Sequence, residues 1–457
     1  MSEPLHDWTA LRLAKALQCR QLRATDVVEH MLDRIAALDR DLRSYVNVSA
    51  SEALAQAHRA DAEFAAGFVR GPLHGVPIAL KDSLATKGIA TTNGAARLTV
   101  DDPPRDAAAV VRLKRHGLVL LGKLNLPEGC FGLHDPAIGQ PRNPWNRDYW
   151  PGASSSGPGV ATAARLCFAA VGTDSGGSVR HPSAANNLFG LKPTIGAINT
   201  AGAFPLAPSL DNIGPMARSP ADLEALFNAL TKAPRRSQDD FGDRIEPVRV
   251  GIDPDWNGRD VEPVISRALE EAVAVFVALG MTVKTVQLPS WHEATEVWLH
   301  LCAPEAAAVH AGRGAPVSPG LQKLIAFGGT IGAGMIEASV VRRRRLCSAI
   351  DDLFAEVDLI LAPIQPFAPP RVDRVKAVDS EKGWPVSASD IGFTALFNLS
   401  GHPAMAMPAG FTAEGLPVGC QIIAAKRHEA LLFHVARAFD TVTGFSGARP
   451  PLADTLV

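Results

Sequence analysis

Apolar positions recur at helical spacing through the first part of the chain. One face of a helix is formed by residues three or four positions apart: Val27, Val28, Met31, Ile35 and Leu38. Asp7 or Thr9 could cap a helix before this one, and Thr25 is placed to cap it. An alanine-rich segment follows. We therefore predict helices over about residues 7–67, with no chemistry of their own.

From Pro72 the pattern changes to short apolar runs that alternate with helical segments. The runs predict strands at 78–81, 118–121, 168–171, 249–252, 404–407 and 421–424. Helical spacing predicts helices at 107–116, 264–279 and 429–440. This alternation is typical of an α/β protein whose central sheet is covered by helices on both faces. No linker or internal repeat interrupts it, so we predict a single domain over residues 1–457.

Composition and charge narrow the possible functions. The chain has 47% hydrophobic and 20% charged residues, as in an ordinary enzyme with a sizeable core, and its net charge of −2 gives no case for nucleic acid or an anionic membrane. The basic run Arg342–Arg345 lies in a helical pattern, which favours a solvated helix face. The six cysteines lack metal-ligand spacing, and no apolar run reaches about 18 residues. We expect a cytoplasmic protein with reduced thiols and no bound metal.

Two Ser/Gly clusters stand out between Pro151 and Gly196. The first holds Ser154, Ser155 and Ser156, and the second runs from Thr173 to Ser178. Such clusters are usually linkers or helix caps. These two are embedded in apolar sequence, and 24 residues with a helix-sized segment separate Ser154 from Ser178. A turn, a helix and a returning strand can bring them together.

Lys81 ends an apolar, strand-like run upstream of both clusters. A single lysine is usually a solvated surface charge. A lysine that closes a buried strand must instead reach water or lose its proton, and the second outcome produces a general base. The neighbouring Asp82 would oppose this outcome if its carboxylate pointed inward.

Together these stretches resemble the amidase signature family. The similar motifs follow one another along most of the chain: GVPIALKD with Lys81, GKLN from Gly122, NPW from Asn143, the 151–196 core, SLD from Ser209, LILAP from Leu359 and LPVG from Leu416. The resemblance implies a large mixed sheet. It also implies a Ser–Ser–Lys triad of Ser178, Ser154 and Lys81, with Ser178 as nucleophile and a cis peptide bond before Ser154.

The sequence departs from the family in two places. The family's Gly-Gly-Ser-Ser-Gly-Gly is here GASSSG from Gly152, so Ala153 and Ser156 replace glycines. The section at about 232–345 departs most, and we expect it to shape the substrate pocket. It ends in the glycine-rich stretch 327–334, which favours either a pocket-gating loop or a surface excursion.

The chemistry of such a triad suggests roles for further residues of the second turn. Backbone N–H groups of Ser175, Gly176, Gly177 and Ser178 would receive the oxyanion. Asp174 and Arg180 would form an ion pair that holds this turn, and Ser155 would bond Lys81 or the turn. We interpret His181, which lies near Ser178, as a structural loop histidine. This chemistry needs no cofactor and no metal.

A Ser–Ser–Lys hydrolase of this kind could have either of two functions. Leu126, Phe131 and Phe204 lie on largely apolar stretches, and an apolar pocket favours a free-standing amidase for aryl or alkyl amides, including anilides, with carbamates (urethanes) and esters as further substrates. Its partner would be a small molecule, and the enzyme a monomer or homodimer. The alternative is the glutamine-hydrolysing component of a tRNA-dependent amidotransferase, which would need an acid and a base for the charged end of glutamine. A phosphate-binding loop is excluded because no lysine opens the helix after Ser156.

Overall fold

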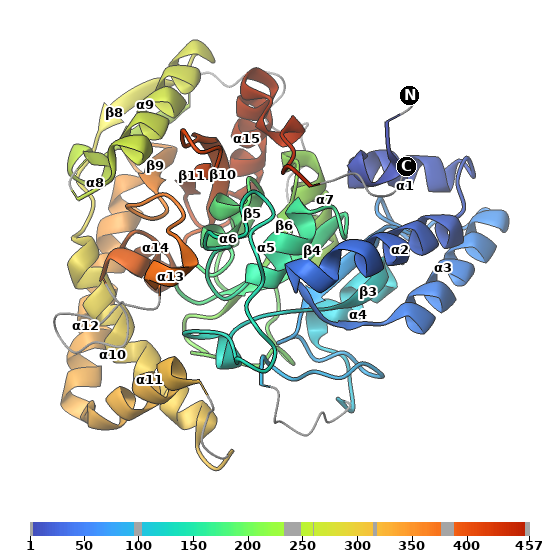
Figure 1. The fold of residues 1–457 in the computed structure, drawn as a ribbon. Helices are drawn as coiled ribbons and strands as arrows, with labels where there is room; N and C mark the ends of the chain where they lie inside the picture. The colour runs from blue at the N-terminus through green and yellow to red at the C-terminus, as the bar shows by residue number, and fades with distance from the viewer. Residues whose placement is uncertain are drawn as a thin grey trace.

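The computed structural model describes residues 3–95, 103–232, 248–258, 260–313, 318–375 and 388–452, the side chains of 388–390 excepted. Within these ranges eleven strands form one sheet (Figure 1): β1 (Tyr45–Val48), β2 (Pro77–Lys81), β3 (Val119–Leu124), β4 (Ala169–Asp174), β5 (Phe189–Lys192), β6 (Asn212–Ala217), β7 (Arg249–Ile252), β8 (Thr282–Thr285), β9 (Leu359–Pro363), β10 (Ala404–Phe411) and β11 (Pro417–Ala424). Their order across the sheet is β1-β3-β2-β4-β6-β5-β10-β11-β9-β7-β8. Every predicted strand overlaps one of them.

The sheet is mixed, as the resemblance implied. Strands β3, β2 and β4 are parallel to one another, the central strands are antiparallel, and β9, β7 and β8 are again parallel. Because β2 and β4 run in parallel, their carboxyl ends reach the same edge of the sheet. Leu80 pairs with Val171 in this register, which places Lys81 beside the start of the second Ser/Gly turn.

Helices cover both faces of the sheet. They are α1 (Ala10–Gln18), α2 (Ala24–Leu42), α3 (Ala50–Ala65), α4 (Ala108–Arg115), α5 (Ser156–Ala163), α6 (Arg180–Ala185), α7 (Pro220–Leu230), α8 (Pro254–Gly258), α9 (Pro263–Ala278), α10 (Trp291–His310), α11 (Pro319–Thr330), α12 (Ala333–Leu353), α13 (Val372–Val375), α14 (Ala388–Ser400) and α15 (Glu429–Thr443). Figure 1 shows α2 and α3 beside β3 and α10–α12 toward the opposite end.

Strand β9 shows how the two cores are divided. Leu359 and Leu361 face the core that contains α2, α7, α9 and α15, whereas Ile360 and Ala362 face the core that contains α10, α11 and α14. All four side chains are buried. Successive strand residues point to opposite faces, so both faces must be covered when every position is apolar. The predicted arrangement of the sheet and its helices is therefore confirmed.

The N-terminal region differs from the prediction in two details. Strand β1 interrupts the predicted helices and pairs antiparallel with β3. The cap at Thr9 is confirmed, since its hydroxyl accepts from Arg12 N at 3.1 Å. The cap at Thr25 is wrong. That residue lies inside α2, whose first N–H groups, Ala24 and Thr25, donate to the Asp61 carboxylate of α3 at 2.6 and 3.1 Å.

The glycine-rich stretch 327–334 is not a loop. It forms the end of α11 and the start of α12, with Ile331 and Gly332 between the two helices, so the loop prediction is wrong. A Cβ on Gly328 would lie 2.2 Å from the Ala303 carbonyl oxygen, so α11 approaches α10 closely there. No single described helix is long and apolar enough to cross a membrane; α11 and α12 together pass that test, but they are bent by 101°.

Candidate active site

Lys81 ends β2 in a fully buried position. Its Nζ lies 2.8 Å from Ser154 Oγ and 2.8 Å from Thr173 Oγ1. Burial lowers the pKa of Lys81 below its ordinary value, because the buried ammonium form would lose its hydration. The lysine therefore has two hydroxyl partners and a reduced tendency to hold its proton.

The Asp82 carboxylate turns away from Lys81. Its Oδ1 lies 3.1 Å from the Nζ of Lys123, which also donates to the Leu84 carbonyl at 2.8 Å. Its Oδ2 accepts from Thr92 N at 2.9 Å. The acid that could have held Lys81 in its charged form is thus engaged by another buried lysine.

Ser155 joins the two Ser/Gly clusters. Its N–H donates to the Ser178 carbonyl at 3.2 Å, and its hydroxyl donates to the Thr173 carbonyl at 3.1 Å. Of the two partners expected for Ser155, the turn is the one observed. Ser154 is 4% exposed, while Ser178 is half-buried and its hydroxyl bonds no described residue. A contact between Ser154 Oγ and Ser178 Oγ is not among the hydrogen bonds of the described residues, and such contacts often form only with substrate bound.

Asp174 and Arg180 hold the second turn. Both side chains are fully buried, and the guanidinium donates to the carboxylate at 3.0 and 3.1 Å. Asp174 also accepts from Gly177 N at 2.8 Å and Val179 N at 3.1 Å. Burial alone would raise the pKa of Asp174, but the charge and hydrogen bonds of Arg180, together with the hydrogen bond from Asn398 and the charge of Lys192, outweigh it and hold that pKa well below its ordinary value.

This network changes the expected set of oxyanion donors. The Gly177 N–H is taken by Asp174, so it does not face an open position. Among the described residues, the N–H groups of Ser175, Gly176 and Ser178 have no acceptor. Glycine is required at 177, where φ is 122° and a Cβ would lie 2.4 Å from His181 Cε1. Three of the four predicted donors are thus available.

Two residues outside the motifs brace the same turn. Trp298 Nε1 donates to the Ser175 carbonyl at 2.7 Å, and Thr394 Oγ1 donates to the Gly176 carbonyl at 2.6 Å. Sequence reasoning missed both, and also Thr173 as a partner of Lys81. Of the three, only Thr173 could have been found from the sequence, because it directly precedes Asp174 in the second Ser/Gly turn.

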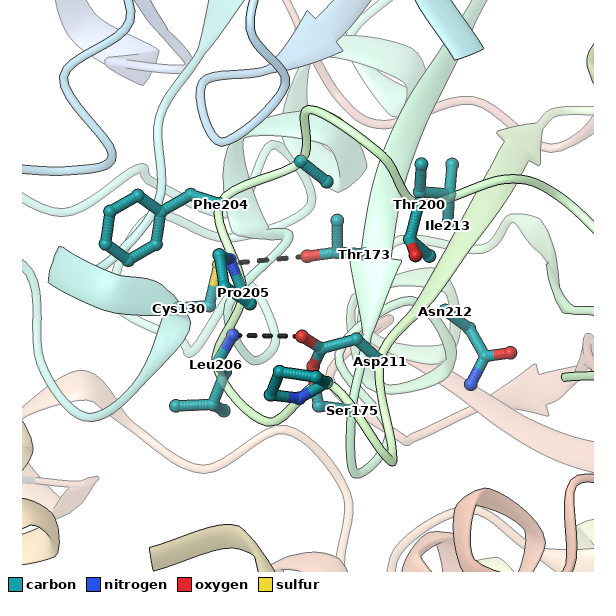
Figure 2. A pocket seen from close by; sticks show the side chains of 12 residues that line it. Cys130, Thr173, Ser175, Thr200, Phe204, Pro205, Leu206, Asp211, Asn212 and Ile213 are labelled. Carbon is teal, nitrogen blue, oxygen red and sulfur yellow. Dashed lines mark hydrogen bonds between the residues drawn. The ribbon is translucent and has the colours of Figure 1, made fainter. Parts of the chain in front are cut away.

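A cavity of about 80 Å³ opens beside Thr173 (Figure 2). Its lining is Cys130, Thr173, Ser175, Thr200, Ala203, Phe204, Pro205, Leu206, Pro208, Asp211, Asn212 and Ile213. Phe204, one of the three residues expected to line the substrate pocket, lines this cavity. Leu126, which is fully buried, and Phe131, which packs against the same core, are not among the lining residues.

The polar groups of this cavity are mostly engaged. Cys130 Sγ lies 3.7 Å from Thr173 Oγ1. The Asp211 carboxylate accepts from Ser175 Oγ at 2.5 Å and from Leu206 N at 3.0 Å, the latter drawn in Figure 2. Burial raises the pKa of Asp211 to about 6. The wall between the turn and the loop at 204–211 is therefore fixed by one buried acid.

Two histidines lie near the triad residues. His134 Nε2 is 2.9 Å from the hydroxyl of Ser156, and burial, followed by the positive charge of protonated Lys81, lowers the pKa of His134 to about 3. Burial and then Arg180 lower the pKa of His181 to about 4. Both imidazoles are neutral at ordinary pH. The described residues contain no group of three or more His, Cys, Asp or Glu that could hold a metal ion.

Comparison with known proteins assigns the family. The family model described as Amidase matches residues 26–433. The chain is 34% identical over 456 residues to AmiD of Mycobacterium tuberculosis, whose name marks it as amidase-related, with 96% of this chain and 95% of that protein covered. It is 36% identical over 490 residues to a glutamyl-tRNA(Gln) amidotransferase component of Azotobacter vinelandii, covering 98% and 99%.

Solved structures agree with this assignment. A bacterial aryl acylamidase of the amidase signature family superposes with a TM-score of 0.85 at 25% identity, over 98% of this chain and all of that one. The chain therefore belongs to the amidase signature family, whose members are hydrolases acting on carbon–nitrogen bonds.

Proposed function

We propose that this protein is a free-standing amidase that hydrolyses carboxylic amides with apolar acyl or aryl groups through Ser178, Ser154 and Lys81. The contact that carries the proposal is the 2.8 Å distance between Lys81 Nζ and Ser154 Oγ, made by a lysine that no described carboxylate pairs. A serine hydroxyl needs a base to become a nucleophile, and a lysine with a lowered pKa can supply one.

The proposed reaction moves one proton along the three side chains. Neutral Lys81 takes the proton of Ser154, Ser154 takes that of Ser178, and the Ser178 oxygen attacks the carbonyl carbon. The carbonyl oxygen becomes an oxyanion that the free N–H groups of the turn receive. The C–N bond then breaks as Ser154 returns its proton to the departing nitrogen and regains one from Lys81. Water attacks the acyl-enzyme by the same route and releases the acid.

The cavity lining supports an apolar acyl or aryl group over glutamine. No lysine, arginine or histidine is among its lining residues, and its one carboxylate, Asp211, is engaged by Ser175 and Leu206. The α-carboxylate of glutamine would find no cation among these lining residues, and a buried unpaired charge is costly. The likeness to an aryl acylamidase points the same way.

A second candidate is the glutamine-hydrolysing component of an amidotransferase. It is favoured by the 36% identity to such a component over nearly the whole of both chains. In that case the protein would release ammonia from glutamine and work with other proteins of the amidotransferase.

One panel of substrates separates the two. The purified protein is assayed alone with a 4-nitroanilide, a simple aryl amide, an aryl carbamate, an aryl ester and glutamine. We expect the aryl substrates to turn over faster than glutamine. Faster ammonia release from glutamine would overturn the proposal in favour of the second candidate. The carbamate arm decides whether urethane hydrolysis belongs to the same activity.

A further inference from the structure

One face of helix α10 contacts both segments that form the candidate site. Trp298, Cys302 and Glu305 lie four and three residues apart and so share that face. Trp298 donates to the Ser175 carbonyl of the second turn at 2.7 Å, and Glu305 accepts from Ser209 N of the cavity loop at 2.9 Å. This helix belongs to the section that departs most from the family pattern.

The indole of Trp298 packs directly on the turn. It is 2% exposed, and a Cβ on Gly176 would lie 3.0 Å from its Cζ2. The ring therefore covers one side of Gly176, while its N–H anchors the preceding carbonyl. Thr394 anchors the following carbonyl from helix α14, which packs against α10.

Anchoring this carbonyl sets the direction of a catalytic donor. In a trans peptide the C=O and N–H bonds point in opposite directions, so a fixed Ser175 carbonyl fixes the Gly176 N–H. That N–H has no acceptor among the described residues, whereas the Gly177 N–H is taken by Asp174. An oxyanion donor is effective only when its direction is set before the reaction.

We propose that Trp298 is a positioning residue for the oxyanion hole, acting through the Ser175 carbonyl to aim the Gly176 N–H at the reacting carbonyl oxygen. The proposal rests on Ser178 being the nucleophile of the proposed amidase. It assigns a catalytic contribution to a residue outside the motifs that define the family.

The test removes the indole N–H, and one of its two variants keeps the fused ring. The first variant is Trp298→Phe, and in the second Trp298 is replaced by 3-benzothienylalanine, which retains the fused-ring shape and lacks the N–H. The matched control is Trp256→Phe, because Trp256 is also 2% exposed and donates to a backbone carbonyl, that of Pro289, at 3.1 Å. Each full-length protein is measured for kcat, KM, thermal midpoint and rate of labelling by a fluorophosphonate, whose phosphoryl oxygen occupies an oxyanion hole.

We expect both Trp298 variants to lose about tenfold in kcat and in labelling rate, with KM changed less than about twofold. Loss of a direct oxyanion donor costs about 10²–10³-fold, and a misaimed donor costs less. The Trp256 variant should keep both rates, whatever its thermal midpoint. Equal rates for wild type and the benzothienyl variant would overturn the inference. Failure of the wild-type protein to be labelled on Ser178 would instead overturn the proposed function.

Discussion

Asp82 follows Lys81 in the chain, yet its carboxylate pairs with Lys123, at 3.1 Å, and not with Lys81. Lys81 and Lys123 lie at or near the ends of neighbouring parallel strands, and both are fully buried. Among the described residues, Lys81 Nζ donates to the hydroxyls of Ser154 and Thr173 and pairs with no carboxylate. The same residue type is therefore a candidate base on one strand and half of a buried ion pair on the next.

Exchanging each lysine for methionine should separate these roles. Lys123→Met leaves Asp82 buried without its cation, and breaking a buried pair in this way costs about 3–5 kcal/mol of unfolding free energy. Lys81→Met should lower kcat by orders of magnitude with a much smaller loss of stability. Urea unfolding and kcat of both variants provide the check. A stable Lys123→Met protein, or an active Lys81→Met protein, would contradict these roles.

Activity should rise with pH. Burial lowers the pKa of Lys81, and only the neutral amine can take a proton. The kcat/KM of the enzyme should therefore increase through that lowered pKa and level off below the ordinary lysine value of about 10.4. Asp211 titrates near pH 6 as well, so the Asp211→Asn variant is the control and should keep the rise due to Lys81. A kcat/KM that stays constant between about pH 6 and 10 would count against a lysine base.

The lowered pKa of Lys81 should also affect how the free energy of unfolding depends on pH. Between the lowered pKa of folded Lys81 and about 10.4, the unfolded chain binds a proton that the folded protein does not. The contribution of Lys81 to unfolding free energy therefore rises with pH across this window. The slope of stability against pH should be smaller in Lys81→Met. An unchanged slope would show that Lys81 is not shifted in the folded protein.

Thr173→Val should weaken catalysis without removing it. The change deletes one of the two hydroxyl partners of Lys81 while keeping the side-chain shape. A single hydrogen bond contributes about 0.5–1.5 kcal/mol, so kcat/KM should fall about three- to tenfold. Thr295→Val is the control, since its buried hydroxyl donates to the Trp291 carbonyl of its own helix and to no other described residue. Equal effects of the two variants would exclude a specific role for Thr173.

The pair of Ser156 and His134 should affect stability more than catalysis. Their side chains are 2.9 Å apart, and Ser156 stands where the family pattern has glycine. Ser156→Ala leaves the His134 nitrogen without this partner, which should cost about 1 kcal/mol of unfolding free energy. A double-mutant cycle with His134→Phe measures the coupling. A tenfold loss of kcat in Ser156→Ala would instead place Ser156 in the proton relay.

Much of this site could be predicted from sequence because its main elements are local. Lys81 ends an apolar run, and the serines lie in two turns joined by one helix and one strand. The partner of Asp82 could not be predicted, because it depends on the register between β2 and β3. The role of Gly177 was misjudged for a similar reason. Its N–H faces the Asp174 carboxylate three residues earlier, and the turn geometry alone decides this.

Contacts between segments far apart in the chain could not be predicted from the sequence. Trp298 is 123 residues from Ser175 and lies in no recognisable motif. Strand β1 was missed because it is a four-residue edge strand with no buried position. The glycines of α11 and α12 carry a loop signal, yet most of them are helical, and close packing on α10 is seen at Gly328. In each case the missing information is tertiary.

The central claim is that Ser178 is the residue that becomes acylated. Its most direct test is peptide mapping by mass spectrometry after reaction with a fluorophosphonate, on the wild-type protein and on Ser178→Ala. We expect a single adduct on the peptide containing Ser178, with no adduct and no turnover in Ser178→Ala although its fold is retained. An adduct on Ser154, Ser155 or Cys130, or full turnover by Ser178→Ala, would contradict it.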